Sequence, residues 1–409
     1  MSGVPVDAMP TRTPPGTAST ENDRAGILDA VAVSLGMRVD FSTMIQSEAS
    51  GDGLVTGHRV GFEAPDGTTR TETVYIQDNP PAAPGEGVLR MQSADGEQMD
   101  VWLYPNDPAL PALAAAVFSE AAAVLLQRLG LPHDDLDVNV TAYRPGKRAV
   151  VRMATPTSTV FLKVVKPRVA EALCNRHAAW QAAGVPVPRA IAWAPDGLVA
   201  LDTLPGVEAI EVVPRLSIDD SFVREVEGLM ESIALLHSDD AARTSLVRRL
   251  DWYADALDAH APSYQREVAQ VRALISAKFD AAPPPPALVT IHGDLHLAQV
   301  FVEPGVPHQI AGVLDIDTAG LGDPADDAAA LWAHLIVTSE YRVLAGDQEF
   351  AESARMLASR FRARWQRASD PGFASRAAAI AATHLLGHAL SGRVSVAILL
   401  ARATDLVSS

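Results

Sequence analysis

Hydrophobic and polar residues alternate between about residues 54 and 105, a pattern typical of half-buried β-strands. The alternating runs are 55–62, 71–76, 87–91 and 99–104. Pro65-Asp66-Gly67 separates the first two runs, and Asp95-Gly96 separates the last two. Because Asp-Gly between alternating runs is a strong hairpin signal, we expect two hairpins in a small β-rich module, preceded by a short helix at 25–35.

A helix and a second group of strands come next. Apolar residues recur every three or four positions over 112–129, which predicts a helix. The expected strands are 136–143, 149–153, 159–165, 190–193 and 198–201, with a helix at 167–182. The segment from Asp202 to Gly206, which contains Leu204-Pro205, then acts as a linker or hinge.

From residue 206 on, the pattern is mostly helical. The predicted helices are 222–237, 251–279 (one helix or two), 328–338, 350–368 and 376–406. Three short apolar runs, 287–291, 300–302 and 310–314, lie between them. We therefore predict a disordered tail at 1–24, a β-rich module at 25–108, a mixed lobe at 109–205 and a mostly helical lobe at 206–409.

Composition and charge narrow the function. The chain has 409 residues, of which 48% are hydrophobic, so it is long enough for two or three folded domains. Its net charge of −17 argues against nucleic acid as a partner, because phosphate contacts need clustered Lys and Arg. An acidic surface attracts cationic substrates, but it is also a common solubility feature, and both interpretations stay open.

The single cysteine and the apolar segments indicate where in the cell the protein is expected to act. Cys174 cannot form an internal disulfide, and we interpret it as a buried helix cysteine in a cytoplasmic protein. Residues 1–22 lack the basic start and apolar core of a signal peptide. No apolar run reaches the roughly 18–20 residues of a membrane span, so we expect no membrane association.

The candidate chemistry lies around the short apolar runs near residue 300. The run at 287–291 leads into a loop that contains Asp294 and Gln299, and the run at 310–314 leads into Asp315. We expect a catalytic loop, a short hairpin and then an acidic loop at the far end of the hairpin. Two carboxylates and an amide on adjacent loops can hold a divalent cation and orient a hydroxyl, which is the equipment that phosphoryl transfer needs.

Two basic features lie in the mixed lobe. Arg144-Pro145-Gly146-Lys147-Arg148 joins two expected strands, and such a turn can cover phosphates with its amides and cations, although any hairpin can carry it. Lys163 lies inside an apolar strand, where it either meets an anion or faces solvent. Glu171, in the first turn of the following helix, either orients Lys163 or is an exposed residue favoured by the helix dipole.

These residues carry a resemblance to a known family. The segment from His292 to Gln299, with His-Gly-Asp at its start, resembles the catalytic loop of aminoglycoside phosphotransferases and choline kinases, which share the protein-kinase-like fold. Gly312-Val313-Leu314-Asp315, with the later Gly322-Asp323-Pro324, resembles their metal-binding segment. The resemblance covers roughly residues 130–409. The form of the loop with His296 and Gln299 is similar to actinobacterial maltokinases and glucosamine kinases, which also carry an extra N-terminal module.

The resemblance implies an α+β, bilobal protein-kinase-like fold with a small β-rich N-terminal extension. It implies that Asp294 is the catalytic base, and that Asp315 and Gln299 bind Mg²⁺. It implies that Lys163 pairs the phosphates of ATP. The Arg144–Gly146–Lys147 turn is a candidate for the same phosphates, and Glu171 is a candidate for orienting Lys163. The backbone from Asp202 to Leu204 would meet the adenine.

Other candidate residues have open roles. His292 and His296, like His384 and His388, have the spacing of a metal pair, but no third ligand is evident and a zinc site is disfavoured. His292 is more consistent with bracing the loop. His384 and His388 either contact the substrate or pack in a helix. Asp317 is a candidate for substrate contact or for support of the metal site, whereas Asp323 and Asp327 are expected to brace the loops.

The predicted function is an ATP- and Mg²⁺-dependent phosphotransferase that acts on a hydroxyl of a small molecule, such as a sugar, an amino sugar or an aminoglycoside-like compound. Most members of the family carry Asn where this chain has Gln299. A catalytically inactive nucleotide-binding protein of the same fold is therefore the alternative. Nucleotidyl transfer on the same fold is a third hypothesis.

Overall fold

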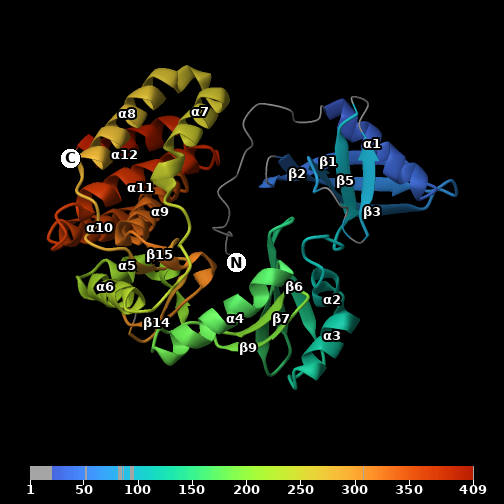
Figure 1. Ribbon diagram of the computed structural model, residues 1–409, viewed down its shortest axis with the longest axis horizontal. Coiled ribbons are helices and arrows are strands. Elements are labelled where there is room, and N and C mark those ends of the chain that lie inside the picture. Colours follow the sequence, from blue (N-terminus) through green and yellow to red (C-terminus); the bar gives the residue numbers. More distant parts are fainter. Residues whose placement is uncertain are drawn as a thin grey trace. The chain divides into compact units, whose positions relative to one another are not determined.

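The structure is a computed structural model that describes residues 21–50, 53–81, 85, 87–92, 96–306 and 308–408. It divides into two units, which Figure 1 shows from one side. Among the described residues, one unit holds everything up to residue 175 together with 190–203, and the other holds 176–189 and everything from 204 on. The predicted tail lies almost wholly outside the described residues, which begin with the helix α1 (Glu21–Ser34).

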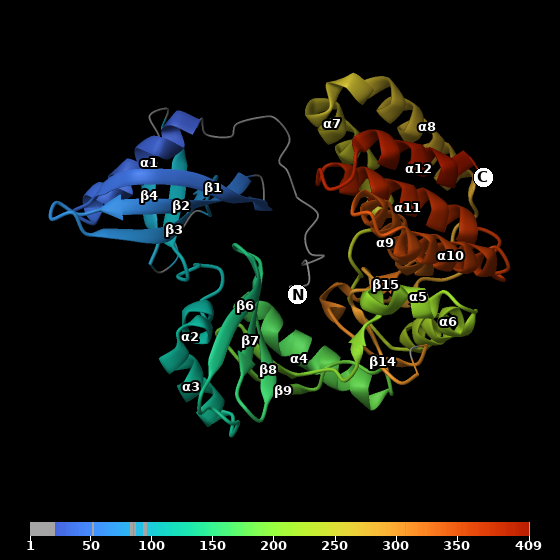
Figure 2. The ribbon, with the colours of Figure 1, turned by 180° about the vertical axis from the view of Figure 1, so that it is seen from behind.

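The first unit begins with the β-rich module. Its strands are β1 (Arg38–Ser50), β2 (Gly53–Glu63), β3 (Thr69–Asp78), β4 (Leu89–Gln92) and β5 (Gln98–Leu103). They form one antiparallel sheet in the order β1-β2-β3-β5-β4, and α1 lies along one face of it (Figure 2). Both expected hairpins are present, β2–β3 and β4–β5, although Asp95 lies outside the described residues. The long edge strand β1 was not predicted.

The second sheet of this unit carries Lys163. Its strands are β6 (Asp137–Arg144), β7 (Arg148–Ala154), β8 (Thr159–Val165), β9 (Ala190–Ala194) and β10 (Leu198–Asp202), in the antiparallel order β6-β7-β8-β10-β9. Helices α2 (Leu113–Val117) and α3 (Ser119–Arg128) pack on one face through apolar residues, and α4 (Pro167–Ala182) packs on the other. The single helix predicted at 112–129 is wrong, because Phe118 has extended backbone (ψ 118°) and separates α2 from α3.

Charged groups join the β-rich module to the second sheet. Glu48 of β1, whose side chain is 5% exposed, accepts hydrogen bonds from Arg144 Nη2 at 3.1 Å and from Lys147 Nζ at 3.0 Å. Asp107 accepts from the Gly146 amide at 2.7 Å and from the Tyr143 hydroxyl at 2.8 Å. Two carboxylates from earlier in the chain therefore hold the β6–β7 turn in place: Glu48 binds its side chains, and Asp107 binds its backbone.

The second unit is mostly helical. Its helices are α5 (Val213–Leu216), α6 (Ser221–Ala234), α7 (Leu250–His260), α8 (Gln265–Ala281), α9 (Pro324–Leu344), α10 (Gln348–Trp365), α11 (Phe373–Ala389) and α12 (Val396–Ser408). Its short strands are β11 (Val207–Glu208), β12 (Val289–Ile291), β13 (Val300–Val302), β14 (Ile310–Val313) and β15 (Gly320–Gly322). The single helix predicted at 376–406 is wrong, because the chain turns between α11 and α12, where Gly392 has φ +69°.

Helix α11 is the centre of this unit. It contacts α8, α9 and α12, and most of its residues are buried. Its many alanines let the neighbouring helices approach closely, because a methyl group fills little space. His384 and His388 therefore project from a helix that is surrounded by protein. Among the helices of the described residues, none combines the length and the apolar character that a membrane span requires.

Arg376 of α11 is the buried ionic centre of the helical unit. Its side chain is only 2% exposed, and it donates to Asp323 at 2.6 Å and to Asp370 at 2.5 Å. Its third contact is the carbonyl of Pro283, at 2.6 Å. Asp323 also caps α9 by accepting from the Ala325 amide. Arg376 thus holds the N-terminus of α9, which follows the acidic loop after the short strand β15.

We expect Arg376→Leu to lower the free energy of unfolding by about 3–5 kcal/mol, because it leaves two carboxylates in a buried site without a counter-charge. Urea unfolding of both proteins measures this change. The matched control is Arg355→Leu, since Arg355 forms an exposed ion pair with Glu352 at 3.4 Å. The control should change stability by no more than about 0.5 kcal/mol. Equal effects of the two variants would contradict the prediction.

Glu48→Gln should destabilise the first unit at pH 7 by about 1–3 kcal/mol, because two buried charge-assisted hydrogen bonds weaken. Burial raises the pKa of Glu48, but the hydrogen bonds and charges of Arg144 and Lys147 outweigh it and hold the pKa below the ordinary 4.5. A depressed carboxyl pKa contributes stability above that ordinary value and loses it as the pH falls through the folded-state pKa.

The difference in unfolding free energy between the wild-type protein and Glu48→Gln should therefore be full at neutral pH and shrink below about pH 4.5. Denaturant titrations at several pH values measure it. Glu72→Gln is the control, because Glu72 lies in the same module and forms only a partly exposed pair with Arg70 at 3.7 Å. A difference that does not depend on pH would refute this role of Glu48.

Candidate active site

Two short antiparallel ladders shape the candidate site. Strand β12 pairs with β15, so that Ile291 lies opposite Gly320. Strand β13 pairs with β14, so that Val300 lies opposite Val313. The two loops that connect these ladders, 292–299 and 314–319, must therefore run side by side. The Leu314 amide donates to the Gln299 carbonyl at 2.8 Å, which joins the loops directly. The predicted arrangement of loop, hairpin and loop is present.

Buried hydrogen bonds hold the first loop in one conformation. Asp327 of α9 accepts from the amides of His292 and Gly293 at 2.8 and 2.7 Å. The His292 ring donates through Nε2 to the Leu314 carbonyl at 2.7 Å. Gly293 has φ +84°, and a Cβ there would lie 2.5 Å from the Thr318 carbonyl oxygen, so only glycine fits. Asp327 and His292 thus brace the loop, as the sequence suggested.

Asp294 follows this braced turn and forms an ion pair. Its carboxylate lies 2.9 Å from Arg243 Nη1, and its side chain is 27% exposed. Burial raises the pKa of Asp294, but the nearby positive charge, above all that of Arg243, lowers it below the ordinary value. Arg243 was missed by the sequence analysis, because no motif or spacing links it to Asp294.

The groups expected to bind Mg²⁺ lie at the junction of the two loops. Gln299 is 6% exposed, and its Oε1 atom is buried without a hydrogen-bond partner among the described residues. Asp315 lies two residues after the end of β14, in a left-handed backbone conformation (φ 56°). An uncommitted amide oxygen on one loop and a carboxylate on the adjoining loop are the kinds of ligand that suit a hard cation, which takes its other ligands from phosphate and water. These residues therefore fit the cation that the resemblance implies.

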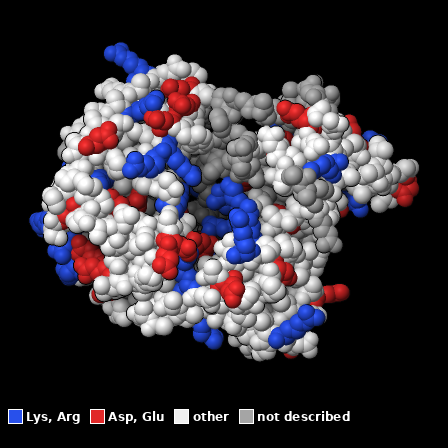
Figure 3. Space-filling model, in the orientation of Figure 1, with Lys and Arg blue, Asp and Glu red and all other residues white. Residues whose placement is uncertain are grey.

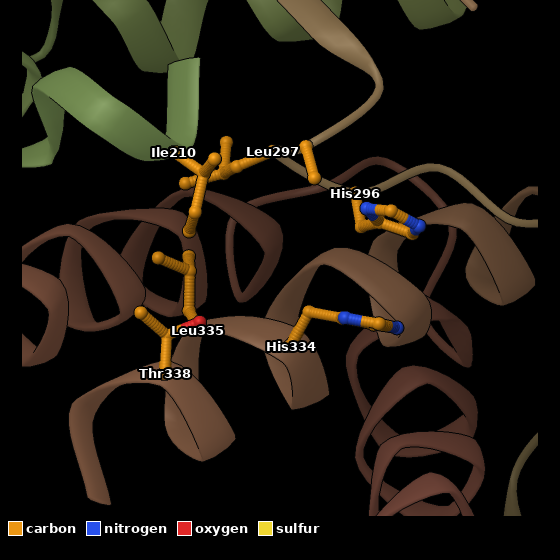
Figure 4. Close-up of a pocket in the computed structure, with 7 residues that line it drawn as sticks. Ile210, His296, Leu297, His334, Leu335 and Thr338 are labelled. Carbon is orange, nitrogen blue, oxygen red and sulfur yellow. The ribbon is translucent and has the colours of Figure 1, made fainter. Parts of the chain in front are cut away.

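A group of histidine rings lies beside Asp294. The rings of His296 and His334 are stacked with their centroids 4.2 Å apart, and His388 meets His334 edge-on at 4.8 Å. Figure 4 shows His296, from the loop, next to His334 of α9, and both line a small cavity together with Leu297 and Leu335. His334 was not predicted, because its only signal is its position in space.

Burial keeps His334, His384 and His388 uncharged. It lowers the pKa of His384 to about 3 and that of His388 to about 4. It also lowers the pKa of His334 well below its ordinary value, with nearby histidines and Arg243 adding to the effect. Within the described chain, no group of three or more His, Cys, Asp or Glu side chains is arranged to hold a metal ion.

The residues expected to bind the nucleotide lie on several elements. Lys163 is 3% exposed and lies in β8 between Val150 and Val199 of the flanking strands. Glu171 is exposed on α4. The cations of Arg144 and Lys147 contact Glu48, and the Gly146 amide contacts Asp107, as described above. Phosphate binding by this turn therefore stays a prediction.

The hinge residues and Asp317 complete the predicted set. Asp202 is the last residue of β10, and its side chain accepts from the Thr203 amide. Leu204 lies against Gly312, where a Cβ would be 2.6 Å from its side chain. The division between the two units falls between Thr203 and Leu204. Asp317 lies in the second loop, and its carbonyl accepts from Arg176 at 3.1 Å.

The charges on the helical unit are mixed. On the side seen at the left of Figure 3, basic and acidic side chains lie interspersed in small groups. Ion pairs of this unit include Arg364 with Glu227 and Arg360 with Asp220. On this face the acidic residues are balanced locally and do not form a continuous acidic surface.

Comparison with known proteins identifies the family. A crystal structure of a thermostable mutant of aminoglycoside phosphotransferase APH(4)-Ia with ADP and hygromycin B is 14% identical, with a TM-score of 0.43, over 70% of this chain and 97% of that chain. Aminoglycoside phosphotransferase APH(3'')-Id from Streptomyces rimosus is 20% identical, with a TM-score of 0.39, over 65% and 99%. The streptomycin–ATP complex of APH(2")-IIa is 11% identical, with a TM-score of 0.44, over 71% and 98%.

No curated protein matches the chain. The model of the Phosphotransferase enzyme family matches residues 138–361, which is more than half of the 409 residues. This match includes the strand with Lys163 and both loops of the candidate site. The expected α+β, bilobal kinase-like fold with a β-rich N-terminal extension is confirmed. The chain belongs to the Phosphotransferase enzyme family.

Proposed function

We propose that the protein transfers the γ-phosphoryl group of ATP to a hydroxyl of a small molecule with the help of Mg²⁺. The observation that carries this proposal is the pair of braced loops, which holds Asp294, Gln299 and Asp315 on one framework. Phosphoryl transfer depends on position and charge more than on covalent chemistry. A rigid framework with one carboxylate for the hydroxyl and a separate amide–carboxylate pair for the cation meets that need.

Each loop residue has a distinct part in the proposal. Asp294 accepts a hydrogen bond from the acceptor hydroxyl and orients its oxygen towards the phosphorus. Asp315 and Gln299 would hold Mg²⁺, which neutralises charge on the transferring phosphoryl group. Asp327 and His292 keep Asp294 in place through the loop backbone. Asp317 is in the second loop, where it serves the metal site or the substrate.

The nucleotide side of the proposal rests on the resemblance. Lys163 is a buried cation in a central strand, where an anion such as a phosphate would offset the cost of its burial. Glu171 would orient it. The Arg144–Gly146–Lys147 turn would bind the phosphates, which would replace Glu48 as its partner. The backbone from Asp202 to Leu204 would contact the adenine. The protein would act in the cytoplasm.

A non-catalytic nucleotide-binding protein is the second candidate, and a specific observation favours it. The proposed base, Asp294, is paired with Arg243. The two cations of the β6–β7 turn, Arg144 and Lys147, are paired with Glu48. A kinase has to make both sets of groups available to its substrates. Release of ADP that depends on an acceptor distinguishes the two functions, whereas release of pyrophosphate would indicate nucleotidyl transfer.

Asp294→Asn should lower the rate of phosphate transfer by roughly 10²–10⁴-fold, because the amide cannot take the hydroxyl proton. The affinity for ATP should change little, because Asp294 serves the acceptor. ADP release with a panel of sugars and aminoglycosides, and calorimetric titration with ATP, measure the two quantities. Asp258→Asn on α7 is a control that should leave both unchanged. Transfer at the wild-type rate by Asp294→Asn would exclude Asp294 as the base.

Gln299→Leu should raise the Mg²⁺ concentration for half-maximal transfer by at least about tenfold, because it removes the buried Oε1 ligand. Gln299→Asn keeps an amide with a shorter reach and should retain more of the Mg²⁺ affinity than the leucine variant. Titrations of ADP release and of ATP binding with Mg²⁺ measure both variants. If Gln299→Leu has the wild-type Mg²⁺ requirement, then Gln299 does not bind the cation.

A further inference from the structure

The ion pair between Arg243 and Asp294 is built into the fold. Arg243 lies in the segment after α6, which is hydrogen-bonded along β15 and the second loop. The Arg243 amide donates to the Thr318 carbonyl at 2.9 Å, and the Ala242 amide donates to the Leu321 carbonyl at 2.9 Å. A Cβ on Gly320 would lie 2.6 Å from the backbone of this segment, so the close approach requires glycine there.

A guanidinium in this position sets the local charge. Arginine stays charged at all physiological pH values, and its nitrogen is 2.9 Å from the Asp294 carboxylate. The carboxylate is the group that an acceptor hydroxyl has to reach. Its charge is therefore largely cancelled at the very point where a cationic acceptor would need it.

Three buried histidines near Asp294 add no charge to the site. His334, His384 and His388 are uncharged because they are buried. His384 Nδ1 and His388 Nε2 are buried atoms that have no hydrogen-bond partner among the described residues. Neutral ring nitrogens can donate to or accept from hydroxyl groups, which do both, but they offer no charge that would bind an ammonium group.

Several nearby carboxylates already have partners within the protein. Asp240, beside Arg243 in the chain, pairs with Arg176 at 3.1 Å. Asp323 pairs with Arg376, and Asp327 is occupied by the amides of the catalytic loop. Burial raises the pKa of Asp326 to about 7, so this group is half neutral at physiological pH. On these elements, the acidic residues are used for structure and do not attract a cationic ligand.

The overall charge of the chain does not change this local balance. The net charge is −17, which favours cations at long range. Exposed charges more than about 8–10 Å away are largely screened at physiological ionic strength. Arg243 is in contact with Asp294, so its charge dominates where the acceptor hydroxyl would bind.

We propose that Arg243 is a specificity-determining residue, which makes the acceptor site select uncharged polyhydroxylated molecules over polycationic ones. The inference rests on the proposed function, because it takes Asp294 as the group that meets the acceptor hydroxyl. The guanidinium keeps its contact with Asp294 and donates to oxygens of a neutral acceptor. An ammonium group of an aminoglycoside would instead meet a like charge at this position.

The test compares the binding of glucose, maltose and the polycation kanamycin, each in the presence of Mg²⁺ and a non-hydrolysable ATP analogue. The wild-type protein should prefer one of the neutral sugars. Arg243→Gln should bind kanamycin at least about tenfold more tightly than the wild-type protein, because a like charge beside Asp294 is removed. Arg243→Lys keeps the positive charge and should retain the wild-type preference.

Arg364→Gln is the matched control. It also removes one arginine from an ion pair, at 2.8 Å from Glu227, but on the exposed face of α10. It changes the net charge by the same amount and should leave the affinity for kanamycin unchanged. A gain as large as that of Arg243→Gln would show that net charge, and not Arg243, decides the selection.

Two further results overturn the inference. One is tighter binding of kanamycin than of both neutral sugars by the wild-type protein, which can be measured whatever the stability of the variants. The other is an unchanged kanamycin affinity in folded Arg243→Gln. Phosphate transfer is measured separately. If no probe is phosphorylated, the proposed kinase function fails on these acceptors, while the binding series still decides the role of Arg243.

Discussion

The register of two three- to four-residue ladders is the constraint on which the candidate site depends. Because Val300 pairs with Val313, Gln299 and Leu314 are hydrogen-bonded neighbours, and Asp315 follows at once. A slip of one residue would turn each side chain to the opposite face and separate the groups that fit a cation. Such short strands contribute little to the stability of the fold by themselves. Asp327 supplies the missing restraint from α9, and Arg376 in turn fixes the start of that helix through Asp323.

The β-rich module has a chemical consequence as well as a structural one. Glu48 reaches from its edge strand to the β6–β7 turn and pairs with both cations there. A nucleotide phosphate that used this turn would compete with a carboxylate that is already in place and nearly buried. The exchange replaces one anion with another, so its free energy is a small difference between large terms. The module can therefore set how readily the turn accepts phosphate without contributing a catalytic group.

The sequence predicted those features whose signals are local. The hairpins β2–β3 and β4–β5 follow from their turns, and the loop at 292–299 follows from the apolar runs on either side of it. Strand β1 was missed because its pattern is irregular, and its ladder contains two register shifts. The breaks at Phe118 and Gly392 were missed because the apolar period continues across them. Arg243 and His334 were missed because only tertiary packing brings them to Asp294.

The acidic composition illustrates why such spatial partners decide function. Taken alone, a charge of −17 fits a protein that binds cations. The structure places an arginine at two carboxylates of this region, Arg176 at Asp240 and Arg243 at Asp294, so that these two positions carry little net charge. Composition measures a sum over the whole surface, whereas an acceptor interacts with the few groups within a screening length. In this fold the local charge at Asp294 differs from the net charge of the chain, because Arg243 is paired with that carboxylate.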